Sequence, residues 1–257
     1  MILAVLQARF SSSRLPGKIM LPLLGEPMLI RQIERIRRSR RIDRLIVATS
    51  TDSSDDPLAE LCRARQIDFF RGSLEDVLDR FYRAALAVNP DQVVRLTGDC
   101  PLTDPAVIDA VIDFCVAGGF DYASNALAPT FPDGLDVEVM KFSCLREAWK
   151  LANLPSQREH VTPYIYQQSE KFKIGSYRRE PDISFLRWTV DEMRDFQLVG
   201  RVYEALYPLN QAFSTDDILA YLARHPELQG FNATIERNEG FKKSLQLDKA
   251  FLDKDPR

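Results

Sequence analysis

The stretch Leu6-Gln-Ala-Arg-Phe-Ser-Ser-Ser-Arg-Leu-Pro-Gly-Lys18 follows an apolar run, Met1 to Val5, that is short enough for a buried strand. It carries three cations, Arg9, Arg14 and Lys18, together with three serines and a Pro-Gly break. A strand, a basic loop and a helix in this order can hold phosphates, because N–H and hydroxyl groups donate to the oxygens while cations neutralise their charge. A solvated basic loop that only joins a strand to a helix is the alternative, and composition favours neither.

The chain has 257 residues, of which 45% are hydrophobic and 28% charged. This is enough for one large α/β domain, or for a main domain with a small second one. Lys and Arg number 34 against 37 Asp and Glu, so there is no basic field and we expect no nucleic-acid partner. No apolar run approaches the roughly 20 residues of a membrane span, and no basic segment precedes the first strand, so we expect neither a membrane span nor a secretory signal.

Four cysteines, Cys62, Cys100, Cys115 and Cys144, are widely spaced and form no Cys-x-x-Cys. This spacing argues against a metal cluster and a disulfide framework, and it suits a reducing compartment, so we expect a cytoplasmic protein. The two histidines leave little room for a histidine-based metal site.

Strand-like and helix-like segments alternate as far as Gly119, with strands expected at residues 2–6, 42–49, 67–70 and 92–96 and a helix opening after Gly72-Ser73. Short connections between them predict an α/β fold with a mostly parallel sheet flanked by helices. The loops after these strands should then share one sheet edge, where open α/β sheets bind ligands. They are the basic loop, Ser50–Asp56, Arg71-Gly72-Ser73 and Thr97-Gly98-Asp99.

The alternation loosens after Gly119. We expect strand ends at Tyr122–Asn125 and Pro132–Val139, a helix over 157–169 that Pro163 kinks or splits, and strands over 171–177 and 185–189. Within a single domain spanning 1–257, residues 120–184 should form a small α/β insert that packs on the sheet edge or on a second subunit. Residues 238–257 should form a helix-like surface tail.

Two aspartates carry the chemical argument. Asp99 follows the strand at 92–96, and Asp191 follows the expected strand at Phe185–Val190. Two carboxylates facing a loop with Lys and Arg are what a Mg²⁺–triphosphate needs, since Mg²⁺ takes one or two carboxylates plus phosphate oxygens and waters. Attack on phosphorus needs mainly positioning and charge neutralisation. A turn residue at Asp99 and a helix N-cap at Asp191 are the alternatives.

Five motifs together resemble the cytidylyltransferases that activate 3-deoxy-manno-octulosonate and acylneuraminate, and most closely their SpsF-like branch, named for spore coat polysaccharide biosynthesis. The resemblance runs from Met1 to about Leu222. Its motifs are Gln7–Lys18 with Leu24-Gly-Glu-Pro-Met28, Val94–Leu102, Gly72–Arg80, Arg158-Glu-His-Val-Thr162 and Trp188-Thr-Val-Asp191.

This resemblance implies a Rossmann-like nucleotidyltransferase fold of the GT-A type, CTP as the nucleotide and Mg²⁺ as the metal. It implies that a sugar or sugar acid attacks the α-phosphate to give a CMP-sugar and pyrophosphate, and it suggests a homodimer. The roles that it implies are Ala8 and Arg9 at the nucleotide with Thr97 beside it, Arg14 and Lys18 at the triphosphate, Ser73 near the cytosine, and Asp99 and Asp191 at the metal.

The sequence also departs from the octulosonate enzymes. Cys100 stands where they carry the acid of Gly-Asp-Glu-Pro, and Asn125 to Glu138 does not match their acid-sugar pocket. A sugar that lacks a carboxylate is therefore open. Candidate sugar-side residues are Asn125, Asp136, Arg158 and His160, although a structural histidine and a surface ion pair are simpler interpretations of the last two.

Two rival functions stay open. A GT-A glycosyltransferase that uses a nucleotide-sugar shares the sheet and the metal-binding acid, but such enzymes usually carry an Asp-x-Asp, and none ends an expected strand here. A non-catalytic nucleotide-binding homologue is the other rival, against which Lys18, Asp99 and Asp191 argue.

Overall fold

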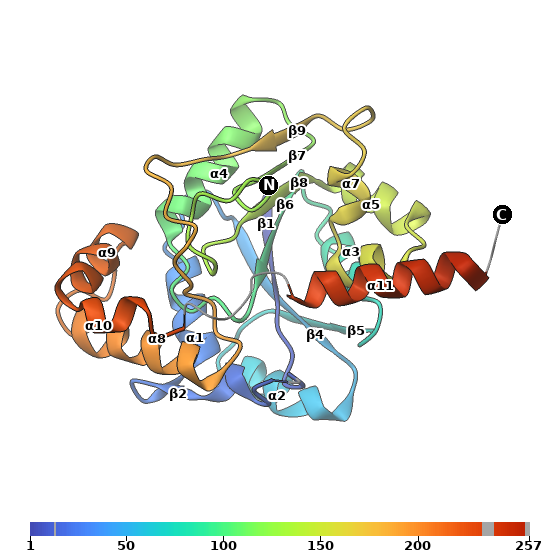
Figure 1. Cartoon of the computed structure of the whole chain (residues 1–257). Coiled ribbons are helices and arrows are strands. Elements are labelled where there is room, and N and C mark those ends of the chain that lie inside the picture. Colours follow the sequence, from blue (N-terminus) through green and yellow to red (C-terminus); the bar gives the residue numbers. More distant parts are fainter. Residues whose placement is uncertain (13, 233–238, 255–257) are drawn as a thin grey trace.

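The computed structural model describes residues 1–12, 14–232 and 239–254. Within them, a seven-stranded sheet has the order β5-β4-β1-β6-β8-β7-β9, and a short β2-β3 pair lies apart from it (Figure 1). The strands are β1 (Ile2–Gln7), β2 (Pro22–Leu23), β3 (Glu26–Pro27), β4 (Arg44–Ser50), β5 (Phe69–Gly72), β6 (Gln92–Thr97), β7 (Tyr122–Ser124), β8 (Glu138–Lys141) and β9 (Ile174–Ser176).

The first four strands of the main sheet are parallel, as the alternating pattern predicts. β1 pairs with β4 on one side and β6 on the other, and β4 pairs with β5. β8 runs antiparallel to β6 and to β7, while β7 and β9 are parallel. The carboxyl ends of β1, β4, β5 and β6 therefore share one edge, and the connection from β7 to β8 lies at that same edge.

Helices cover both faces of the sheet (Figure 1). The α-helices are α1 (Met28–Ile36), α2 (Asp56–Ala64), α3 (Val77–Leu86), α4 (Pro105–Ala117), α5 (Phe142–Leu151), α6 (Pro155–His160), α7 (Pro163–Tyr166), α8 (Met193–Leu206), α9 (Thr215–Arg224), α10 (Pro226–Gln229) and α11 (Glu239–Lys254). One apolar cluster joins the sheet to α1, α2 and α4, and another joins it to α3, α5 and α7. A third packs α8 and α9 around Trp188.

Residues 120–184 differ from the expected insert. β7 and β8 lie inside the central sheet, between β6 and β9, so much of this segment completes the sheet. Pro163 splits the expected helix as predicted, with α6 ending at His160 and α7 beginning at Pro163. The segment therefore belongs to the core that supports the shared sheet edge.

Three expected elements are wrong in detail. The strand expected at 185–189 is irregular. Phe185 lies in a turn, and a single bridge joins Arg187 to Asp133, because the N–H groups of Trp188 and Thr189 both donate to the Asp133 carbonyl. The helix expected to open at Gly72-Ser73 begins at Val77, where Asp76 caps it by accepting from the Asp79 N–H. Most of Pro132–Val139 is loop, and β8 begins only at Glu138.

Residues 239–254 form the helix α11, which packs on α6 (Figure 1). Residue 238 and residues 255–257 of the expected tail lie outside the described residues. Along the part of the chain that the structure describes, every helix is too short or too polar to cross a bilayer.

Candidate functional site

The basic loop is fixed at both ends by its own backbone. Gly17 has φ +71°, and its N–H donates to the Phe10 carbonyl at 2.9 Å. A Cβ at Gly17 would lie 3.0 Å from the Phe10 ring, so the ring packs directly beneath this glycine. The Phe10 N–H in turn donates to Oδ1 of the buried Asp55 at 2.6 Å. The loop after β1 is thereby held against the turn between β4 and α2, where the sequence predicts that the strand ends meet.

The loop after β6 closes against the end of β1. The Gly98 N–H donates to the Gln7 carbonyl at 2.7 Å. A Cβ at Gly98 would lie 2.9 Å from the Ala8 Cβ, closer than such carbons approach. Glycine is therefore required here, and its absence of a side chain lets Asp99 follow immediately beside the basic loop.

Lys18, Asp99 and Asp191 converge. The Lys18 Nζ lies 3.3 Å from Asp99 Oδ2 and 2.9 Å from Asp191 Oδ1, and it donates to the Val190 carbonyl at 2.7 Å. Asp191 reaches this point because the Val190 N–H donates to the Asp99 carbonyl at 2.8 Å, which docks the 187–191 segment on the β6 loop. The two carboxylates thus face one buried ammonium group.

The short distances between these groups shift the pKa of Lys18 and of Asp99 toward their charged forms. Burial alone would lower the pKa of Lys18, but the neighbouring Asp99 and Asp191 raise it above its ordinary value. Burial would raise the pKa of Asp99, but Lys18 and the hydrogen bonds from Thr97 and Cys100 lower it to about 2. The lysine is therefore cationic and the carboxylate ionised at neutral pH.

The Arg187 guanidinium binds three carboxylates beside this site, a role that the sequence did not predict. Its guanidinium binds Asp133 at 2.8 Å, Asp191 at 2.8 Å and Asp195 at 3.1 Å. Its exposed fraction is 6%, and Asp195 is fully buried. Asp191 also binds Arg14 at 3.0 Å. The spacing of Arg187, Asp191 and Asp195 at four-residue intervals was the available signal, but an expected strand over this segment obscured it.

Two adjoining cavities open at this sheet edge. We call them the loop cavity, of about 440 Å³, and the acid cavity, of about 450 Å³. The loop cavity is lined by the basic loop, including Ala8, Arg9 and Lys18. The acid cavity is lined by Asp133, Asp136 and Glu138. The residues common to both linings are Arg14, Arg95, Thr97, Asp99, His160, Asp191 and Gly240.

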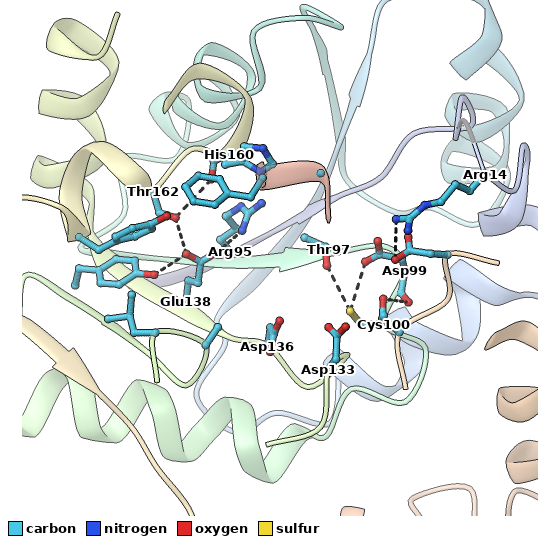
Figure 2. A pocket seen from close by; sticks show the side chains of 18 residues that line it. Arg14, Arg95, Thr97, Asp99, Cys100, Asp133, Asp136, Glu138, His160 and Thr162 are labelled. Carbon is cyan, nitrogen blue, oxygen red and sulfur yellow. Dashed lines mark hydrogen bonds and ion pairs between the residues drawn. The ribbon is translucent and has the colours of Figure 1, made fainter. Parts of the chain in front are cut away.

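A hydrogen-bonded cluster forms one wall of the acid cavity (Figure 2). Glu138 accepts hydrogen bonds from the hydroxyls of Tyr122 and Thr162, each at 2.6 Å, and its other oxygen binds Arg95. Figure 2 shows Asp133 and Asp136 pointing into the space between this cluster and Asp99. Cys100 lies beside Asp99, and burial together with the charges of Asp99, Asp136 and Asp133 raises the pKa of its thiol well above the ordinary value.

The structure brings most of the sequence-predicted residues to the cavities. Those that line one or both are Ala8, Arg9, Arg14, Lys18, Thr97, Asp99, Asp136, His160 and Asp191. Three others lie elsewhere. The Ser73 hydroxyl accepts from the Asp76 N–H, and Arg158 binds Asp76 and the Trp149 carbonyl.

Asn125 is the third of these, and the structure gives it another role. It is fully buried, its amide donates to the Leu135 carbonyl at 2.8 Å, and its oxygen accepts from the Val137 N–H at 2.8 Å. Asn125 therefore shapes the segment that carries Asp133 and Asp136 without facing the acid cavity itself.

The N-terminal half of α11 completes both cavities, which the sequence does not indicate. Phe241 meets the His160 ring edge-on, with centroids 5.1 Å apart. The Ser244 hydroxyl donates to Glu159 at 2.6 Å and lies 2.9 Å from His160 Nε2. Burial lowers the pKa of His160, so the imidazole is neutral at neutral pH. A surface helix with few apolar residues gives no signal for this position.

The residues present fit a magnesium ion. Asp99 and Asp191 both direct an oxygen toward the position of the Lys18 ammonium, so two hard carboxylate ligands reach one point. Mg²⁺ in nucleotide sites takes one or two carboxylates and completes its shell with phosphate oxygens and waters. No third carboxylate is needed for such a site.

Several known proteins resemble this chain over most of its length. The model of a family described as cytidylyltransferase matches residues 3–236. An uncharacterized protein of Methanocaldococcus jannaschii is 36% identical over 239 residues, which are 92% of this chain and 96% of the relative. The spore coat polysaccharide biosynthesis protein SpsF of Bacillus subtilis is 32% identical, over 88% of this chain and 95% of the relative. A cytidylyltransferase structure from Leptospira borgpetersenii superposes with a TM-score of 0.85 at 34% identity, covering 92% of this chain and 99% of that one.

Proposed function

The chain belongs to the cytidylyltransferase family, and on that premise we propose that it transfers CMP from CTP to a sugar hydroxyl and releases pyrophosphate. The observation that carries this proposal is the convergence of Lys18 with Asp99 and Asp191 at the junction of two cavities. We assign one cavity to the nucleotide and the other to the sugar, so the phosphate would be attacked at their junction.

We assign the loop cavity to the binding of the nucleotide, CTP. Ala8 and Arg9 line it at the end of β1, and Thr97 lines it at the end of β6, where they would contact the nucleoside. Arg14 and Lys18 would bind the triphosphate, because a fixed guanidinium and a buried ammonium neutralise phosphate charge without losing much side-chain freedom. Both cations pair with Asp191 in the structure, beside the position where the phosphates would bind, and they would turn toward the phosphates when CTP enters.

The proposed step forms one bond and breaks one. The sugar oxygen attacks the α-phosphorus, the bond from that phosphorus to the bridging oxygen breaks, and pyrophosphate leaves with the electron pair while the hydroxyl proton passes to water. Lys18 would move from the carboxylates toward the departing charge. Such a transfer depends mainly on positioning and charge stabilisation, so no protein nucleophile is required.

Asp99 and Asp191 would hold Mg²⁺. When bound, the ion offsets the charge that develops on the phosphate oxygens and lowers the pKa of a hydroxyl that it contacts. The role of the protein is to present two ionised carboxylates, and the lowered pKa of Asp99 keeps its carboxylate ionised over the working range of pH.

The biological setting rests on the relatives. The name of the Bacillus subtilis relative, spore coat polysaccharide biosynthesis protein, supports a role in surface glycan synthesis.

We also infer that the protein is cytoplasmic and forms a homodimer. Analytical ultracentrifugation would test the dimer. Exposed leucines on α11, Leu247 and Leu252, are in keeping with a further contact on that helix.

The test is pyrophosphate release from CTP, Mg²⁺ and a panel of free sugars, with UTP, ATP and GTP as nucleotide controls. We expect sugar-dependent release with CTP and loss of that release in Asp99→Asn. Asp216→Asn, at an exposed position on α9, is the matched control and should keep the wild-type rate. Wild-type activity in Asp99→Asn, or a nucleotide-sugar consumed without any use of CTP, would contradict the proposal.

A further inference from the structure

The acid cavity has an unusual charge balance for a site that would bind a sugar acid. Its lining contains five carboxylates, from Asp99, Asp133, Asp136, Glu138 and Asp191, and two guanidinium groups, from Arg14 and Arg95. Lys18 and Arg187 lie outside this lining but pair with Asp99, Asp191 and Asp133. A sugar carboxylate placed here would therefore meet carboxylates whose cations are already engaged, and it would find no cation to offset its own charge. Recognition of a carboxylate usually relies on a guanidinium that is available for a bidentate contact.

Both guanidinium groups in this lining already bind a carboxylate of the protein. Arg95 binds Glu138, and side-chain exposures of 15% and 10% show that this pair is largely sheltered from water. Arg14 binds Asp191 at 3.0 Å, and the proposed function assigns Arg14 to the triphosphate. Releasing Arg95 would leave Glu138 buried without its cation, which is a costly change.

His160 does not supply a positive charge either. Burial and the nearby Arg95 lower its pKa, so the ring stays neutral at neutral pH. Its Nε2 faces the Ser244 hydroxyl at 2.9 Å, and Phe241 covers its edge. The imidazole therefore contributes a neutral polar surface at the junction of the two cavities.

Asp133 and Asp136 are set rigidly on the opposite wall. The Asp133 carbonyl accepts from the N–H groups of Trp188 and Thr189 at 2.6 and 2.9 Å, and Asn125 fixes the backbone on either side of Asp136. Figure 2 shows both carboxylates directed into the cavity. Carboxylates are hydrogen-bond acceptors only, so the groups that they can bind are hydroxyls or amines.

We propose that the acceptor is a sugar without a carboxylate, whose hydroxyl or amino groups donate hydrogen bonds to Asp133 and Asp136. This inference rests on the proposed function, because it names the substrate class for the sugar half of the same site. The Arg95–Glu138 pair, with Tyr122 and Thr162, forms the fixed wall against which the sugar ring packs.

The experiment measures sugar binding directly, so that it does not depend on turnover. Saturation-transfer NMR on the full chain is run with two pools of free sugars, one of neutral and amino hexoses, the other of hexuronates, 3-deoxy-manno-octulosonate and N-acetylneuraminate. We expect transfer to members of the first pool and none to the second. In Asp136→Lys the preference should shift toward the sugar acids by about tenfold or more, which corresponds to about 1.4 kcal/mol.

The controls separate this inference from the proposed function. Asp216→Lys makes the same charge change on the exposed surface of α9 and should leave the preference unchanged. CTP binding with Mg²⁺ is titrated separately, and its absence would contradict the proposed function alone. A sugar acid that binds as well as any neutral sugar would overturn the inference, as would binding of neither pool or a preference that Asp136→Lys does not move.

Discussion

The loop cavity and the acid cavity share β6 but are built in different ways. The loop cavity takes three of its five Lys and Arg residues, Arg9, Arg14 and Lys18, from one continuous stretch that follows β1. The acid cavity gathers its lining from β6, the β7–β8 connection, α6 and α11, segments that are up to about half the chain apart. A site whose residues lie in one stretch can be identified from the sequence. A site formed by segments far apart in the sequence can be identified only from the three-dimensional structure.

The two cavities should respond to different substitutions if this comparison is right. Changes in the basic loop should weaken nucleotide use and leave sugar binding intact. Changes in the 132–138 segment should do the reverse, and changes in α11, which lines both cavities, should affect both. Arg187 contacts acids of both regions and should affect both.

Lys18→Met is expected to have the largest effect. Loss of the ammonium removes charge stabilisation from the phosphate and leaves Asp99 and Asp191 facing each other. We expect kcat/KM to fall by about 10³, or about 4 kcal/mol, as for removal of other phosphate-binding cations. Steady-state pyrophosphate release measures this, while sugar binding by NMR should be unchanged. Loss of sugar binding in the same variant would contradict the separation of nucleotide binding and sugar binding between the two cavities.

Arg187→Met should lower the free energy of unfolding by about 3–5 kcal/mol, because it leaves the buried Asp195 without its cation. Urea unfolding of the variant measures this cost. Arg201→Met, in which the side chain is 68% exposed and pairs with the exposed Glu204, is the matched control and should change little. Equal stability of the two variants would show that Arg187 does not join the two regions.

Gly134→Ala should damage the acid cavity alone. Gly134 has φ +110°, and an added Cβ would lie 2.5 Å from the Thr189 nitrogen. We expect about 2 kcal/mol or more of lost stability and weaker sugar binding, with the dissociation constant for CTP unchanged. Gly119→Ala is the control, since Gly119 also has a positive φ, of +61°, but no atom within 4 Å of the added carbon. Calorimetric titration with CTP would reveal any unexpected loss of nucleotide binding.

Ser244→Ala should have the smallest effect. It removes the hydrogen bonds to Glu159 and His160 and costs about 1 kcal/mol, because the neighbouring groups can turn to water. Ser244 lines the loop cavity and its partner His160 lines both cavities, so we expect KM for CTP to rise a few-fold and KM for the sugar to rise less. Ser53→Ala, at an exposed surface position on the β4–α2 turn, provides the comparison. A change in KM for the sugar alone would show that Ser244 acts only on the acid cavity.

Much of the fold could be predicted because its signals are local. The apolar runs at β1, β4 and β6 and the helix patterns between them require only neighbouring residues, and Pro163 splits its helix for a steric reason. The expected strand over 185–189 failed for a non-local reason. Leu186 and Trp188 pack in the apolar cluster that contains α8, while Arg187 turns inward to Asp133, which lies 54 positions earlier in the sequence.

The site could be predicted to a similar extent. Lys18 and Asp99 follow from the rule that strand ends meet at one edge, and the structure brings them together with Asp191. Asp191 was expected there after a strand that does not form, and it reaches the site because the Val190 N–H donates to the Asp99 carbonyl. Asn125 was a polar residue on a loop, and only the path of the chain shows that it bridges Leu135 and Val137. The same limit applies to Phe241 and Ser244, whose role depends on how α11 packs on α6.

The reversed direction of β8 has a consequence for how such a protein can change. β7 and β8 form an antiparallel hairpin inside the sheet, and its connecting residues, 125–137, carry Asp133 and Asp136 at their far end. The pairing of β8 with β6 fixes the hairpin stem independently of what the connection contains. If the proposed function holds, a side chain of this connection that faces the acid cavity, such as Asp136, can be replaced, by evolution or by design, to select another acceptor. Asp133 and Gly134 must then keep the contacts with Arg187 and Thr189 that hold the connection in place.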